Sequence, residues 1–142
     1  LQIATKKAHK AGVEITFDEG MSFDLPYEDE SFDRVVSSLF FHHLSRKNKL
    51  ETLREVSRVL KPKGEFHVAD WGLPASRLMR GTSYLIQFLD GFETTADSFD
   101  GLLPQLMAEA GFASIEETAH FNSLFGTIRL HKCNRQVILE DK

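Results

Sequence analysis

The spacing of apolar residues predicts two strands, separated by a loop, in the first third of the chain. Residues 13–17 alternate apolar and polar side chains, the period-two pattern of a strand with one buried face. Residues 18–31 are acidic and contain Gly20 and Pro26, which predicts a loop. The apolar run that follows, residues 35–41, favours a strand buried on both faces, as in a parallel sheet.

Helical spacing recurs in four places along the chain. Residues 1–11 carry lysines near their end, where cations suit the helix dipole, and Gly12 is a natural stop. Ser45 is a candidate N-cap for a second helix, which Pro62 and Gly64 end. This second helix has one apolar stripe, made by Leu50, Leu53, Val56 and Leu60. Residues 73–89 and 99–110 predict two further helices.

Three strands complete the predicted order of elements. Residues 65–70 follow the second helix, whereas residues 115–121 and 125–131 are close enough to pair as an antiparallel hairpin. Residues 134–142 are polar and read as a tail, which leaves residues 1–133 as the folded domain. Helices alternating with strands of this length predict an α/β fold with a mostly parallel sheet and an antiparallel C-terminal hairpin.

Composition narrows the classes of protein that fit. The chain has 142 residues and a net charge of −4, which gives no basic surface for nucleic acid. No apolar run has the length of a membrane span. A single cysteine, Cys133, excludes an internal disulfide, so we expect a cytoplasmic protein. The chain opens with Leu1 and lacks a signal-peptide pattern, so we expect a truncated piece of a longer protein.

Four segments, taken in order, resemble the class I S-adenosylmethionine-dependent methyltransferases, in particular the ubiquinone- and menaquinone-type group. They are residues 20–33 (GMSFDLPYEDESFD), residues 35–44 (VVSSLFFHHL), residues 58–70 (RVLKPKGEFHVAD) and residues 110–112 (AGF). Each segment is weak alone, but their order and spacing make the set specific. The resemblance implies an incomplete Rossmann-like sheet in which the family order 3-2-1-4-5-7-6 has lost strands 1 and 2.

The resemblance also implies S-adenosylmethionine as cofactor, although the family's glycine-rich turn has no counterpart here. That turn and an acidic residue after strand 2 hold the methionine end and the ribose in the family. The expected cofactor-binding residues that remain are Gly20, Met21, Ser22, Ser37, Ser38 and Phe40. Met21 stands where many relatives have an acidic residue, and its sulfur is a weak acceptor that can still pack on a flat ring. This chain alone is therefore expected to be inactive.

Residues at the ends of the predicted central strands are candidates for contact with the methyl acceptor. His43 is the candidate catalytic base, because histidine titrates near neutral pH. The candidate substrate-binding residues are His42, Asp70, Trp71, Tyr84 and Phe88. For each, a purely structural role stays open: a packed histidine ring, a strand-end cap, or a helix packed on the sheet. No metal site is expected, because adjacent histidines on an extended segment point apart.

Two functions follow as alternatives. The first is methyl transfer to a small-molecule acceptor, possibly one with an apolar portion, by the intact protein. The second is a non-catalytic interaction or dimerisation module. Loss of strands 1 and 2 would leave the strand at residues 13–17 without a neighbour and would bare one sheet edge. We therefore expect either closure of that gap within the chain or a homodimer through the exposed edge.

Overall fold

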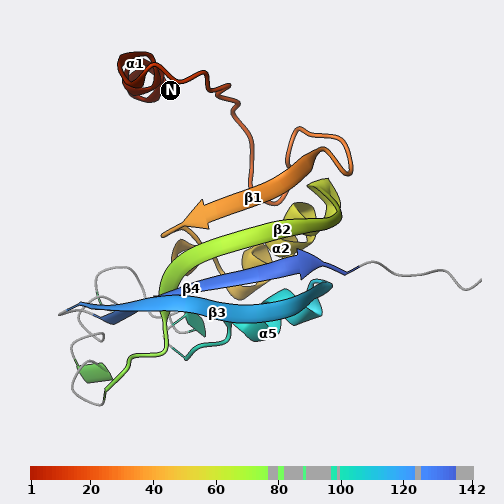
Figure 1. Ribbon diagram of the computed structural model, residues 1–142. Helices are drawn as coiled ribbons and strands as arrows, with labels where there is room; N and C mark the ends of the chain where they lie inside the picture. The colour runs from red at the N-terminus through yellow and green to blue at the C-terminus, as the bar shows by residue number, and fades with distance from the viewer. Residues whose placement is uncertain (77–79, 82–87, 89–96, 99, 124–125, 137–142) are drawn as a thin grey trace, which may run out of the picture.

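Four strands form one mixed sheet in the computed structural model, which describes residues 1–76, 80–81, 88, 97–98, 100–123 and 126–136 (Figure 1). The strands are β1 (Phe32–Ser38), β2 (Leu60–Gly72), β3 (Phe112–Ser123) and β4 (Gly126–Arg135), in the order β1-β2-β4-β3. β1 pairs parallel to β2, and β4 is antiparallel to both β2 and β3. Three of these four strands therefore share a direction, although only one neighbouring pair is parallel. The order agrees with the 4-5-7-6 half of the sheet that the family resemblance implies.

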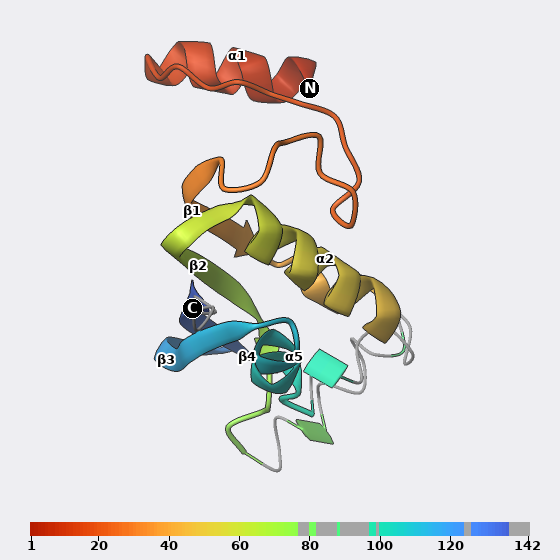
Figure 2. The ribbon, with the colours of Figure 1, turned by 90° about the vertical axis from the view of Figure 1, so that its right-hand side faces the viewer.

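Two helices cover one face of this sheet (Figure 2). They are α2 (Arg46–Val59), which connects β1 to β2, and α5 (Leu103–Glu109), which precedes β3. Ser45 caps α2 as predicted, because its side chain accepts a hydrogen bond from the Asn48 amide at 3.3 Å. Alternate residues of β2 point into the core on this side. The buried cluster contains Phe41, Leu53, Val56, Leu60, Phe66, Val68, Leu103, Leu106, Met107, Phe112 and Cys133.

The opposite face of the sheet has no helix over it within the described part of the chain. Val36 is 74% exposed, whereas Val35 packs against the core, so β1 is buried on one face only. The expectation of a strand buried on both faces is therefore wrong for β1. On this open face Glu65 receives hydrogen bonds or ion pairs from Lys132, His67 and Arg34, which lie on three strands. Hydrogen bonds from these three side chains, the one from Lys132 first among them, lower the pKa of Glu65 to about 2.

The N-terminal segment stands away from the sheet (Figure 2). α1 (Gln2–Ala11) forms and ends at Gly12 as predicted, but Ala8 is its only buried residue. Residues 13–20 carry no strand, so the predicted strand at residues 13–17 is wrong. A strand needs a neighbour for its amide and carbonyl groups, and none of the described strands lies beside it. Within the described residues the gap is therefore not closed, and Val13 and Ile15 stay 49% and 54% exposed.

The remaining boundaries differ from the sequence-based expectations by a few residues. The predicted helix at residues 99–110 is shorter, because α5 begins only at Leu103. Both hairpin strands are longer than expected, since β3 and β4 pair from Phe112–Arg135 to Ser123–Gly126. Asn134 and Arg135, assigned to the tail from the sequence, thus pair within the sheet. The predicted helix at residues 73–89 lies largely outside the described residues.

Candidate functional site

A buried carboxylate organises the turn that follows β1. Asp70, near the end of β2, is 1% exposed. Its Oδ2 accepts hydrogen bonds from the backbone amides of Phe40, Phe41 and His42 at 3.1, 2.6 and 3.4 Å. Its Oδ1 accepts from the Trp71 amide at 2.7 Å and lies 2.6 Å from His42 Nδ1. The Asp70 side chain therefore accepts hydrogen bonds from backbone amides that have no backbone acceptor in this short turn.

Strand pairing brings Asp70 to this position. Ser38 pairs with Ala69, and the Leu39 amide donates to the Ala69 carbonyl at 2.8 Å, which sets residue 70 beside the first residues after β1. Leu39 adopts φ 50°, the left-handed region that a leucine rarely occupies. This residue turns the chain from β1 into the short 3-10 helix η1 (Phe41–His43). Because the Asp70 carboxylate holds the amides beyond it, the surrounding structure maintains this strained residue.

The two histidines of η1 differ in exposure. His42 is 4% exposed and held by Asp70, whereas His43 is exposed to solvent. Their ring centroids are 3.9 Å apart. His42 Nδ1 faces the Asp70 carboxylate, so the ring orientation is fixed by that contact. The structure thus brings together His42, His43 and Asp70, three residues that the sequence offered as separate candidates, with Asp70 occupied by five hydrogen bonds.

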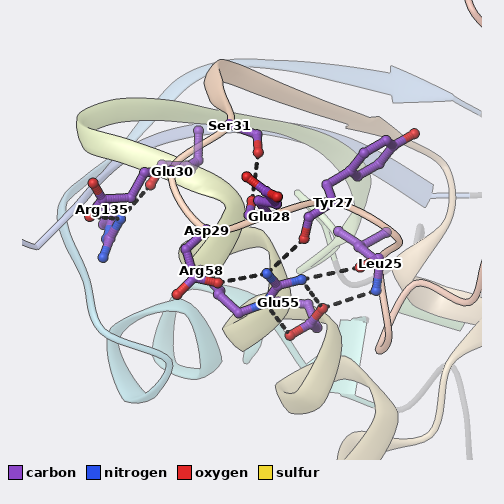
Figure 3. A network of polar contacts seen from close by, with 10 residues as sticks. Leu25, Tyr27, Glu28, Asp29, Glu30, Ser31, Glu55, Arg58 and Arg135 are labelled. Atoms are coloured by element: carbon purple, nitrogen blue, oxygen red, sulfur yellow. Dashed lines mark hydrogen bonds and ion pairs between the residues drawn. The ribbon is translucent and has the colours of Figure 1, made fainter.

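A second set of contacts fixes the acidic loop before β1 onto α2 (Figure 3). Arg58 of α2 donates to the carbonyls of Leu25 and Tyr27 and to the carboxylates of Asp29 and Glu55. Glu55 in turn accepts from the Leu25 amide at 2.9 Å. The Arg58 guanidinium lowers the pKa of Glu55, and Glu55, with Asp29, raises the pKa of Arg58. A planar guanidinium suits this fan of acceptors better than an ammonium would.

Further toward the start of the loop, Ser22 Oγ lies 2.9 Å from Thr52 Oγ1 of α2. Gly20 is packed so closely that a Cβ there would lie 2.9 Å from Pro26 Cδ. The loop from Gly20 to Tyr27 is therefore held against α2 at several points. Arg58 is part of the segment at residues 58–70 that carries the family resemblance, but its reach to this loop was not visible from sequence spacing.

These two held segments meet at a hollow on the surface. Gly20, Met21, Ser22 and Phe40 all line it. Asp18, Glu19, Leu44 and Asn48 line it too, and sequence reasoning did not single them out. Met21 is 57% exposed, and Met21 and Phe40 offer apolar surface on which a flat ring can pack. Carboxylates and amides beside it can accept or donate hydrogen bonds to a polar rim of such a ring.

Other candidate residues lie elsewhere. Ser37 and Ser38 line a different depression, on the open face of the sheet with His67 and Thr118. Trp71 is half-buried and lines a third cavity, on the α5 side. Phe88 is 74% exposed, and Tyr84 lies outside the described residues. The hollow beside Gly20 thus unites four of the six residues expected to bind the cofactor.

Removing the Asp70 carboxylate should destabilise the whole turn. Asp70→Ala leaves several buried amides and a buried imidazole without their acceptor, and we expect a loss of about 3 kcal/mol or more in the free energy of unfolding. Asp33→Ala is the control, because the Asp33 side chain is 83% exposed and pairs with Lys61 only at the surface. That control should lose less than about 1 kcal/mol. Urea denaturation of both variants measures the difference, and equal losses would contradict the role given to Asp70.

Comparison with known proteins places this geometry in context. Residues 1–68 match the family described as Methyltransferase domain. Methyltransferase GfsG of Streptomyces halstedii is 31% identical over 126 residues, which cover 83% of this chain and 42% of that protein. Ubiquinone/menaquinone biosynthesis C-methyltransferase UbiE of Shewanella sp. (strain ANA-3) is 26% identical over 152 residues, covering 93% of this chain and 59% of that protein.

The fold has close counterparts among solved structures. The YcgJ protein of Bacillus subtilis superposes with a TM-score of 0.76 at 18% identity, over 96% of this chain and 78% of that one. The chain spans about half of the length of the two curated relatives named above, GfsG and UbiE. None of the helices in the described ranges has the length and hydropathy of a membrane-spanning segment.

Proposed function

Because this chain belongs to the class I S-adenosylmethionine-dependent methyltransferases, we propose that the intact protein transfers a methyl group to a small-molecule acceptor. The observation that supports this most is the shared hollow of Gly20, Met21, Ser22 and Phe40. Two segments far apart in sequence, one before β1 and one after it, line the same depression. In open α/β sheets, ligands bind at the carboxyl ends of the parallel strands, and Phe40 follows the carboxyl end of β1.

The residues present fit one side of an adenosine group. Met21 and Phe40 supply apolar surface, and Glu19 and Asn48 supply polar groups beside it. Ser22 is engaged with Thr52, so its role is to hold the loop rather than to reach the ligand. The sequence has no pair of close glycines for the methionine end of the cofactor. We propose residues 1–133 as one part of the methyltransferase domain, with the cofactor's other contacts supplied from outside them.

Bound S-adenosylmethionine supplies a methyl group that is already activated by the sulfonium. What remains for the protein is to align the acceptor with that methyl group and to exclude water. His43 is the proposed base for acceptors that must lose a proton, since its ring is exposed beside the held ring of His42. Asp70 positions His42 and His43 because it holds the backbone amides of η1 and the His42 ring. Trp71, the next residue along β2, is half-buried.

An unpaired sheet edge favours a second function for this chain, pairing with another copy. The two outer strands differ in how they discourage such pairing. β3 has two register shifts against β4 and the charged residues Glu116 and Glu117, features that protect edges. β1 offers the uncharged pair Val35 and Val36 at its centre, and no described strand covers its outer edge. The exposed apolar segment at residues 13–17 of a second copy is the proposed partner.

Cofactor affinity tests the first function. For the 142-residue chain we expect S-adenosylmethionine to bind with a Kd no tighter than about 1 mM, because contacts to the methionine end and ribose are lacking. Met21→Asp restores an acceptor at the rim of the hollow and should tighten binding roughly threefold to tenfold. Ile3→Asp, on exposed α1, is the control and should change nothing. An NMR titration decides; a micromolar Kd, or equal effects of both substitutions, would contradict the proposal.

Solution mass tests the second function. Light scattering coupled to size-exclusion chromatography should show a dimer at tens of micromolar, because the β1 edge is open. Val36→Lys places a charge at the middle of that edge and should yield a monomer. Phe121→Lys is a matched control, since Phe121 is 61% exposed but lies on β3, and it should stay dimeric. A monodisperse monomer for the unmodified chain would exclude the dimerisation function.

A further inference from the structure

One side of α2 pairs with the loop before β1 over the second half of the helix. Thr52 Oγ1 lies 2.9 Å from Ser22 Oγ. Glu55 accepts from the Leu25 amide at 2.9 Å, and Arg58 donates to the Leu25 carbonyl at 3.2 Å (Figure 3). Side chains three or four positions apart are neighbours on one side of a helix, so these contacts form a single row. The loop therefore follows α2 from Thr52 to near its end.

Asn48 is the next position of this row, one helical turn before Thr52. Its backbone amide donates to Ser45 Oγ, which caps the helix. Its side chain is half-buried and makes no hydrogen bond among the residues that the structure describes. Asn48 instead lines the hollow beside Gly20, together with Leu44. A partner for this side-chain amide can therefore come from a molecule bound in the hollow.

The other polar side chains of the hollow are engaged or offer only one kind of group. The Ser22 hydroxyl is held by α2, and the Tyr27 hydroxyl donates to Asp18 at 3.0 Å. Glu19 carries a carboxylate, which can accept a hydrogen bond but cannot donate one. Asn48 is therefore the side chain of the described lining that has both a donor and an acceptor free.

A carboxamide matches the amino edge of adenine. Its oxygen accepts from the exocyclic amino group while its NH2 donates to a neighbouring ring nitrogen, the bidentate pairing by which asparagine reads adenine in nucleic acids. Met21 and Phe40 line the same hollow with apolar surface on which the ring can pack. The Met21 sulfur is a weak acceptor and cannot hold the amino group well. Asn48 can supply the acceptor that Met21 lacks.

From these contacts we infer that Asn48 is the specificity-determining residue for the base of the bound nucleoside. Its amide oxygen accepts from the amino group of adenine, and its NH2 donates to the adjacent ring nitrogen. This role rests on the proposed function of the hollow and deepens it. The family resemblance places the acceptor for the amino group at the position of Met21, in the loop. In this chain α2, which packs on the core, carries that acceptor instead.

A ligand pair that differs only in the amino group tests this role on the 142-residue chain. Adenosine and purine riboside share the ring system and the ribose, but purine riboside has a hydrogen in place of the amino group. NMR titration should show adenosine binding about threefold to tenfold tighter, because purine riboside lacks one hydrogen bond. The side-chain NH2 signals of Asn48 should shift with adenosine. Equal affinities for the two nucleosides would overturn the inference and leave a nucleoside site in place.

Substitutions on the first turns of α2 separate the amide from the rest of the hollow. Asn48→Leu keeps the size of the side chain and removes both polar atoms, so this variant should bind adenosine and purine riboside equally. Asn48→Asp retains an oxygen acceptor and should keep a preference for adenosine. Lys47→Leu is the matched control, because the Lys47 side chain is 81% exposed on the same helix. This control should show the full preference of the unmodified chain.

The outcomes distinguish this inference from the proposed function. An unchanged preference for adenosine in Asn48→Leu would overturn the role of Asn48 alone. Absence of shifts at residues 18–27 and Phe40 with millimolar adenosine would overturn the nucleoside hollow and, with it, this inference. Asn48→Ala, with a smaller side chain and a high helix propensity, repeats the test if Asn48→Leu fails to fold. It should also bind both nucleosides equally.

Discussion

The carboxylate of Asp70 is a negative group almost without access to water, held by hydrogen bonds at the point where two parallel strands end. Three of its donors are consecutive amides that follow β1, and a fourth is the ring of His42. Burying a carboxylate is costly unless it is fully hydrogen-bonded, and here the requirement is met by the same turn that presents Phe40 and His43. The carboxylate and the turn therefore stabilise one another, and the ligand-facing edge depends on both.

A second anchor, Arg58, acts on the other segment of the same hollow. Its guanidinium holds the loop after Gly20 against α2 by donating to the backbone carbonyls of Leu25 and Tyr27. The position of this loop therefore depends more on its backbone than on the identity of its side chains. α2 carries Arg58 near its end and, closer to its start, Thr52, which contacts Ser22 of the same loop. Since α2 connects β1 to β2, the helix that packs on the core also sets the distance between the two segments. Core packing and the geometry of the hollow thus share one element.

The sequence predicted elements that depend on neighbouring residues better than it predicted contacts between residues far apart in the chain. The Ser45 cap, α1, α2 and the C-terminal hairpin followed from local pattern, whereas the order of the strands in the sheet was implied only by the family resemblance. The strand at residues 13–17 did not form, since alternation shows only that a segment can pair, and Val13 and Ile15 found no neighbour. Asp70 and His42 were singled out for substrate contact, but their mutual hydrogen bond joins residues 28 apart and leaves no local signal. The same holds for Arg58, which reaches residues 29 to 33 positions earlier.

The central claim is that the segments held by Arg58 and Asp70 form one wall of a nucleoside site. Photolabelling of the chain with 8-azidoadenosine at millimolar concentration, followed by peptide mapping, tests it most directly. The account predicts labels within residues 18–27 and at Phe40 or Leu44, with both reduced by Arg58→Met, which frees the loop without touching the hollow. Labels confined to the open face around Ser38 and Thr118, or to the cavity that Trp71 lines, would contradict it.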